Sequence, residues 1–158
     1  GENVRNLLQE IGKTAARLQK NESLQKYAAI LGEALQAVGE LTKNFGLWSG
    51  GSGLVIPILN ARPYLMIFGD LMVGWQLLQA AGIAVEKLQV IYQEAGVEGK
   101  AAQRSLARSN EEVAFYEGKI AAAKYFTVEV VNRLKSQCQS IEMQEKVAVE
   151  MLDASFGF

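Results

Sequence analysis

Residues 64–92 read YLMIFGDLMVGWQLLQAAGIAVEKLQVIY, and this stretch decides the fold. Its first part, up to Trp75, is apolar almost all round a helix. Asp70, Gln76 and Gln79 interrupt the stretch, and its fully apolar part is shorter than the roughly 20 residues that a membrane span requires. The stretch therefore predicts a central helix that is buried on two sides within a helical domain.

Two amphipathic segments precede this helix. Apolar residues recur at helical spacing from Val4 to Leu18, and again from Leu24 to Phe45. Between the two segments, Asn21-Glu22-Ser23 predicts a turn and supplies candidate N-caps. Such a short connection predicts that the two helices form an antiparallel hairpin.

A glycine-rich segment separates the hairpin from the central helix. Residues 46–53 read GLWSGGSG, and their four glycines predict a flexible connector that Trp48 anchors to the core. The segment lacks the Gly-Lys-Ser/Thr ending of a phosphate-binding P-loop and follows no predicted strand. Pro63 suits the first turn of the central helix, where a missing N–H costs nothing.

The C-terminal part predicts one more long helix. Residues 96–108 are polar and predict a solvated loop, with an anion contact as the less favoured interpretation. Ser109 and Glu112 form a capping box that starts a helix whose apolar stripe reaches Leu134. Residues 147–158 predict a last short helix or a docked tail.

We therefore expect a single domain over residues 1–158 with an all-α fold. The expected architecture is an antiparallel four-helix bundle with a short C-terminal helix or tail. The balance of 16 basic and 17 acidic residues gives a net charge of −1, which offers no positive field for nucleic acid.

The residue types that usually carry chemistry are scarce. There is no histidine, which removes the commonest general base and the commonest metal ligand. Cys138 is the only cysteine, so neither an internal disulfide nor a multi-thiolate site is possible, and we interpret it as a structural thiol. We assign no catalytic, cofactor-binding or metal-binding residue to this chain.

Three charged residues deserve a separate interpretation. Glu117 lies among aromatic residues that could raise its pKa, but Lys119 beside it favours an ordinary surface charge. Arg62 and Asp70 lie about two helical turns apart on one side of the central helix. We expect each of these two to meet a partner on another helix or at an interface, and not to pair with the other.

Two blocks of sequence carry a resemblance to a known family. Residues 60–69 read NARPYLMIFG and precede Gly74-Trp75, and residues 114–126 read AFYEGKIAAAKYF. Together the blocks resemble the C-terminal helical domain of acyl-CoA dehydrogenases, in the methylmercaptopropionyl-CoA dehydrogenase-like branch. The blocks describe packing and contain no chemical motif.

The resemblance implies that the chain was excised from the C-terminus of a longer flavoenzyme, and Gly1 in place of Met agrees with this. The parent would use FAD and a glutamate base to remove hydrogens from the α and β carbons of an acyl-CoA. That base belongs to a Tyr-Glu-Gly motif upstream of this domain, so Tyr116-Glu117-Gly118 does not inherit its role.

The resemblance also sets expectations for partners and location. The isolated chain should be inactive and hold no cofactor of its own, with FAD bound by the parent. Its expected partners are the catalytic core of the parent and further copies of itself, with no nucleic acid and no membrane. The expected location is cytoplasmic.

Two alternatives stay open at this point. The chain is a free-standing helical interaction or dimerisation module, or it is a carrier that holds an acyl chain inside the bundle. A continuous cavity lined by Met66, Phe68, Met72 and Trp75 would favour the carrier.

Overall fold

The computed structural model describes residues 2–51 and 53–157, and all of the regular structure in these ranges is helical. The prediction of an all-α fold is therefore confirmed. Gly1, Ser52 of the predicted connector and Phe158 of the predicted tail lie outside the described residues, and so do the expectations that concern them. In chain order the helices are α1 (Glu2–Leu18), α2 (Gln25–Trp48), α3 (Val55–Leu59), α4 (Ala61–Glu94), α5 (Lys100–Ser109), α6 (Glu111–Glu129), α7 (Leu134–Glu142) and α8 (Val147–Glu150), with the 3-10 turns η1 (Val131–Arg133) and η2 (Asp153–Phe156).

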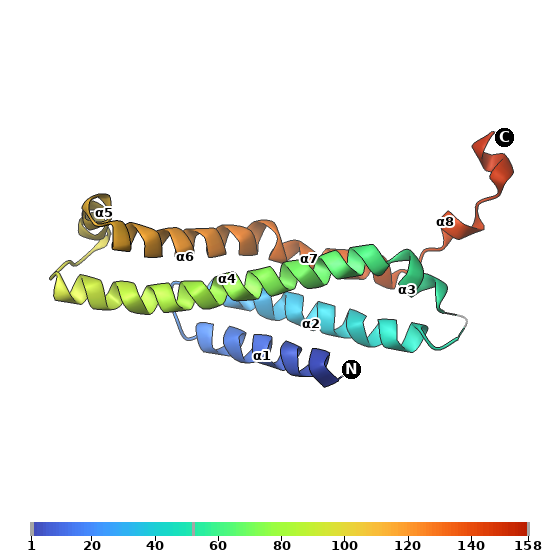
Figure 1. Cartoon of the computed structure of the whole chain (residues 1–158), viewed down its shortest axis with the longest axis horizontal. Helices are drawn as coiled ribbons and strands as arrows, with labels where there is room; N and C mark the ends of the chain where they lie inside the picture. Colours follow the sequence, from blue (N-terminus) through green and yellow to red (C-terminus); the bar gives the residue numbers. More distant parts are fainter. Residues whose placement is uncertain (1, 52, 158) are drawn as a thin grey trace.

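The long helices α1, α2, α4 and α6 lie side by side, and successive ones run in opposite directions (Figure 1). Helix α4 makes its most extensive contact with α6, while α2 contacts α1, α4 and α7. This arrangement is compatible with the predicted antiparallel four-helix bundle.

The core forms where apolar residues three or four positions apart fall on one face of each helix. Each fully buried aliphatic side chain stabilises the fold by about 1.5–3 kcal/mol relative to an exposed one. The largest side chains that are fully buried are Ile11, Leu24, Leu31, Leu41, Ile56, Leu71, Leu78 and Leu134.

A glycine sets the closest approach between α4 and the segment after α6. A Cβ atom added at Gly74 would overlap Cγ2 of Val131, and it would lie 3.8 Å from Cδ1 of Phe126. Gly82 of α4 allows a similar approach to α1, since a Cβ there would lie 2.8 Å from Cδ2 of Leu18. Glycine is therefore needed at position 74 because its neighbour there is a stiff β-branched side chain.

Several predicted boundaries were wrong. Residues 100–109 form α5 and not a solvated loop, because good helix formers dominate this segment and α5 packs against α6. The N-cap of α6 is Asn110 and not Ser109: its side chain accepts hydrogen bonds from the backbone N–H groups of Glu112 and Val113, at 3.0 and 3.1 Å.

Further differences concern helix ends. The predicted fourth helix breaks after Glu129, and its apolar stripe continues through η1 into α7. Asn21 makes a turn with Ser23 but does not cap α2, whose N-cap is Leu24. Helix α3 was not predicted, whereas Trp48 packs against the core and Pro63 lies in the first turn of α4, as expected.

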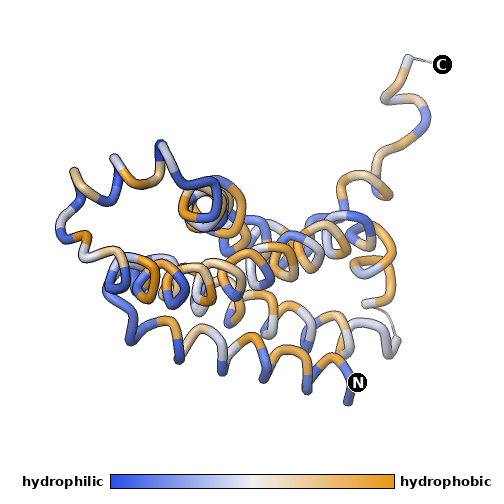
Figure 2. The backbone as a smooth tube through the Cα atoms, turned by 60° about the vertical axis from the view of Figure 1, so that its left-hand side comes forward, coloured by the Kyte–Doolittle hydropathy of each residue, from blue (hydrophilic) through white to orange (hydrophobic). Residues whose placement is uncertain are grey.

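The C-terminal segment was predicted as a last helix or a docked tail. It contains the short helix α8, but it stands away from the bundle (Figure 2). Its large apolar residues are exposed, with Leu152 at 72% and Phe156 at 60%. The described part of the tail is therefore not docked on the bundle.

Candidate interaction surfaces

One buried hydroxyl links α1 to α4. Thr14 accepts hydrogen bonds from the indole Nε1 of Trp75 at 2.9 Å and from Nε2 of Gln79 at 3.1 Å. It donates its own proton to the carbonyl oxygen of Glu10 at 3.1 Å. The donor and both acceptor sites of the hydroxyl are then used, so this cluster is a structural anchor with no free group for chemistry.

Glu117 also has a structural partner. The hydroxyl of Tyr92 near the end of α4 donates to Oε1 of Glu117 on α6 at 3.0 Å. Burial, together with the adjacent carboxylate, raises the pKa of Tyr92 to about 12. Glu117 therefore helps to hold α4 to α6, and its lack of a catalytic role stays a prediction.

The lone cysteine is enclosed by the bundle. Cys138 of α7 is buried and unpaired by disulfide. Burial first, and the charge of Glu142 second, raise the pKa of Cys138 to about 11. A thiol with this pKa stays neutral and poorly nucleophilic near neutral pH, which agrees with the structural interpretation.

Two charged residues of α4, Arg62 and Asp70, were expected to meet partners outside their own helix. Among the described residues, neither Arg62 nor Asp70 takes part in an ion pair. Asp70 is half-buried and lines a small groove between α4 and α7, together with Gln137 and Ser140. That Arg62 meets a partner at an interface stays a prediction.

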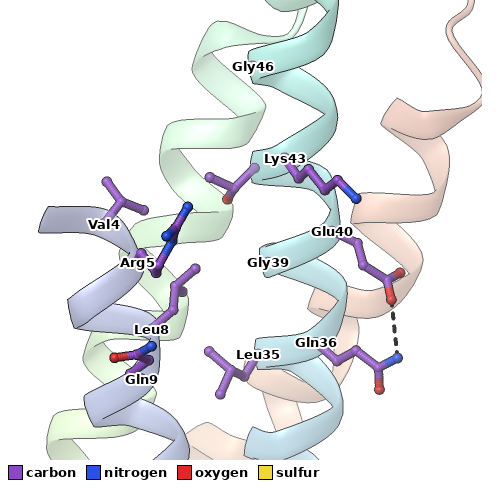
Figure 3. Close-up of a pocket in the computed structure, with 11 residues that line it drawn as sticks. Val4, Arg5, Leu8, Gln9, Leu35, Gln36, Gly39, Glu40, Lys43 and Gly46 are labelled. Atoms are coloured by element: carbon purple, nitrogen blue, oxygen red, sulfur yellow. Dashed lines mark hydrogen bonds between the residues drawn. The ribbon is translucent and has the colours of Figure 1, made fainter. Parts of the chain in front are cut away.

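A shallow apolar groove of about 810 Å³ runs between α1 and α2 (Figure 3). Leu8 and Leu35 line it from the two helices, and Gly39 leaves its floor open. The carrier hypothesis required a different cavity. Met66 is exposed, whereas Phe68, Met72 and Trp75 pack against the core, so these four do not line one chamber.

One side of α4 is not covered by any other helix of the described chain. The helix is buried against α6 and α2, as predicted, but a third side faces solvent along most of its length. Polar Gln76 and Lys87 lie on this side, which we call the α4 face. Its exposed apolar residues are Leu65, Met66, Val73, Ile83 and Val90.

By length and composition α4 could cross a membrane, and 33% of its most apolar window is buried. This is weak evidence, because the core helix of a soluble protein has the same composition. Among the described residues no cluster of His, Cys, Asp or Glu could hold a metal ion. The surfaces that remain are suited to packing against another protein.

The sequence indicated an apolar helix but not which side of it would be free. A helix that carries apolar residues on every side shows no periodic pattern in its sequence. Its exposed side can therefore be identified only when its packing partners are known. The same holds for α6, where Phe115 and Tyr125 are exposed.

Comparison with known proteins gives a consistent result. The family described as "Acetyl-CoA dehydrogenase C-terminal like" matches residues 7–152. The chain is also 33% identical over 98 residues to the broad-specificity linear acyl-CoA dehydrogenase FadE5 of Mycobacterium tuberculosis. That alignment covers 62% of this chain but 13% of the relative, so the chain spans a small part of the relative's length.

Proposed function

Because this chain belongs to the family of acetyl-CoA dehydrogenase C-terminal-like domains, we propose that it is the accessory C-terminal domain of an FAD-dependent acyl-CoA dehydrogenase. The domain is not catalytic. It packs on the catalytic core of its parent, and the parent dehydrogenates an acyl-CoA between its α and β carbons. The relative's name indicates linear acyl-CoA thioesters as the substrate class.

The α4 face supports this role most directly. Five large apolar residues are exposed along one side of a single helix, where a monomer that needs no partner normally carries polar residues. The accessible surface of the chain is 10324 Å², whereas a compact monomer of this mass is expected to expose about 7,800 Å². The tail that stands away from the bundle contributes to this excess (Figure 2), and a typical stable interface covers about 800 Å² on each partner.

FAD belongs to the rest of the parent in this proposal. The regular structure of the described residues is entirely helical. The groove between α1 and α2 is lined by aliphatic residues and glycine together with polar and charged side chains, among them Arg5 and Lys43, and it contains no glycine-rich phosphate-binding loop. We assign no step of the reaction to this chain. We propose a cytoplasmic location for the parent, and membership of the methylmercaptopropionyl-CoA dehydrogenase-like branch.

The test is to express the complete gene that encodes this chain and record its visible spectrum. We expect yellow flavin absorbance that bleaches when a linear acyl-CoA is added. A colourless product no larger than this chain would leave a free-standing helical module as the function.

A second measurement tests the α4 face in the same full-length protein. Leu65→Gln combined with Ile83→Gln should expose the junction to limited proteolysis and release this domain, while the flavin spectrum is retained. The matched control is Leu47→Gln on α2, because Leu47 is 66% exposed and Leu65 is 70% exposed. Equal protease resistance of all variants would mean that another surface contacts the core.

A further inference from the structure

We propose that α6 is the contact between two copies of this chain, which pair with their α6 helices antiparallel about a two-fold axis at Ala121 and Ala122. The proposal deepens the role in subunit packing given above. Its test uses the chain alone, so it can fail while the dehydrogenase assignment stands, and the reverse is also possible.

The surface is a continuous side of α6 that no other element of the described chain covers. Its residues recur every three or four positions, which places them on one side of the helix. All of them are exposed, with Phe115 at 58% and Tyr125 at 71%. This set, which we call the α6 stripe, comprises Phe115, Gly118, Ala121, Ala122, Tyr125 and Val128.

The order of large and small residues along the α6 stripe is self-complementary. Gly118 and Tyr125 lie equally far from the midpoint between Ala121 and Ala122. In an antiparallel pair, Tyr125 of each copy therefore lies over Gly118 of the other, and the alanines meet at the axis. A Cβ added at Gly118 has no neighbour within 4 Å in the single chain, so the space for the incoming ring is free. Such isologous contact is typical of two-fold dimers.

Charges at the two ends of α6 agree with the same register. The first turn carries Glu111 and Glu112, whereas at the other end Arg133 pairs with Glu129 at 2.9 Å and Lys135 pairs with Glu33 on α2 at 3.5 Å. In the antiparallel pair the acidic first turn of one copy lies beside the exposed Glu129–Arg133 pair of the other, and the opposed helix dipoles favour this arrangement.

Near the middle of α6, Lys124 reaches over the ring of Tyr27 on α2 and Glu117 accepts from Tyr92 on α4, so both lie off the contact. Lys119 is exposed and lies over the ring of Phe115 at the edge of the stripe.

Position in the fold leaves the middle of α6 accessible. Helix α6 runs along an edge of the bundle, with α5 near its N-terminal end and the C-terminal segment beyond α7 (Figure 1). The contact that a second copy makes is centred on the middle of α6, which lies well away from the C-terminal segment, while α5 contacts α6 near its start.

Sedimentation equilibrium of the chain should give a concentration-dependent dimer, with twice the chain mass of 17.3 kDa. Gly118→Gln fills the space opposite Tyr125 and should raise the dimer Kd by about tenfold or more. Gly32→Gln on α2 is the matched control, since a Cβ there also meets nothing within 4 Å, and it should leave the Kd unchanged. Circular dichroism checks that both variants are folded, and Tyr125→Ser provides a second disruptive variant.

Cysteine cross-linking tests the register. On mild oxidation, Ala121→Cys or Ala122→Cys should give a disulfide-linked dimer, whereas Ser140→Cys on the exposed side of α7 should not. The native Cys138 does not compete because it is buried. A chain that stays monomeric up to about 100 μM, or a dimer that tolerates Gly118→Gln and forms no link at either alanine, would overturn the proposal.

Discussion

Helices α1 and α6 lie on the outside of the same bundle, but their outer sides differ in chemistry. The outer side of α1 carries charged residues, including the exposed Lys13–Glu10 ion pair, and its apolar residues point inward. The outer side of α6 instead carries aromatic residues and alanines, and α4 beside it also exposes aliphatic side chains. A helix with a charged outer side needs one packing partner, whereas a helix that is apolar on both sides needs two. In the α1–α2 half of the bundle the outer side of α1 therefore suits contact with solvent, whereas in the α4–α6 half the exposed apolar sides of α4 and α6 suit the contact with another protein surface that we propose.

The largest expected effect is the difference in unfolding free energy between an alanine substitution at Gly74 and one at Gly82. Gly74→Ala forces the added methyl group into Val131, and we expect a loss of about 3 kcal/mol in the free energy of unfolding. Gly82→Ala, which faces the flexible end of Leu18 on α1, should cost about 1 kcal/mol or less. Urea unfolding of the two variants measures the difference. Equal costs would mean that the α4–α6 contact is no more tightly packed than the α1–α4 contact.

Alkaline pH should weaken each half through a different group. Folding raises the pKa of Cys138, on the α2 side, from 9.0 to about 11, and that of Tyr92, between α4 and α6, from 10.0 to about 12. In both cases the folded state keeps a proton that the unfolded state releases, so stability is fully present below the lower value and falls as the pH rises through the window. The loss due to Cys138 should reach about 2 kcal/mol near about pH 10.5.

Two variants assign these losses. Cys138→Ala should flatten the stability curve between pH 9 and 11, and Tyr92→Phe should flatten it only above pH 10, as measured by urea unfolding at a series of pH values. A curve that is unchanged by both substitutions would show that other groups cause the alkaline loss.

The start of α6 provides a smaller test. Asn110→Ala removes the acceptor for two backbone N–H groups and should cost about 1 kcal/mol, whereas Ser109→Ala should cost almost nothing. Thermal unfolding of the two variants checks this order. The reverse order would mean that the capping box at Ser109 operates in solution.

The smallest effect is expected at the α4 face. Val73→Gln in the chain alone should change the free energy of unfolding by less than about 0.5 kcal/mol, because Val73 is already exposed. Chemical denaturation measures the change. A cost above about 2 kcal/mol would mean that Val73 is covered within the chain, and the contrast between the two halves would then disappear.

The sequence predicted the helices that have one apolar stripe better than it predicted their ends. The α1–α2 hairpin follows from a regular spacing of apolar residues and a short polar turn. The break after Glu129 could not be predicted, because Val130 and Val131 give neither the glycine nor the proline signal that usually marks a helix end. The choice of Asn110 over Ser109 as N-cap was equally inaccessible, since both residue types cap helices well.

The candidate surfaces were less predictable than the fold. The resemblance in residues 60–69 and 114–126 indicated the family, which the match over residues 7–152 confirms. Those blocks did not indicate which of their residues face outward. Leu65 and Phe68 are similar in sequence context, yet Leu65 is exposed and Phe68 packs on the core. Only the position of neighbouring helices distinguishes them.

The hydroxyl of Thr14 also selects one axial position for α1. Apolar residues at helical spacing make nearly equivalent contacts after a helix slides by one turn, about 5.4 Å, along its neighbour. Hydrogen bonds are directional, and the donors on Trp75 and Gln79 can reach an acceptor on α1 only when Thr14 is opposite them. A slipped isomer would leave both donors without that acceptor, so this single oxygen converts a sliding contact into one fixed alignment, and the emission of Trp75 would report which isomer is present.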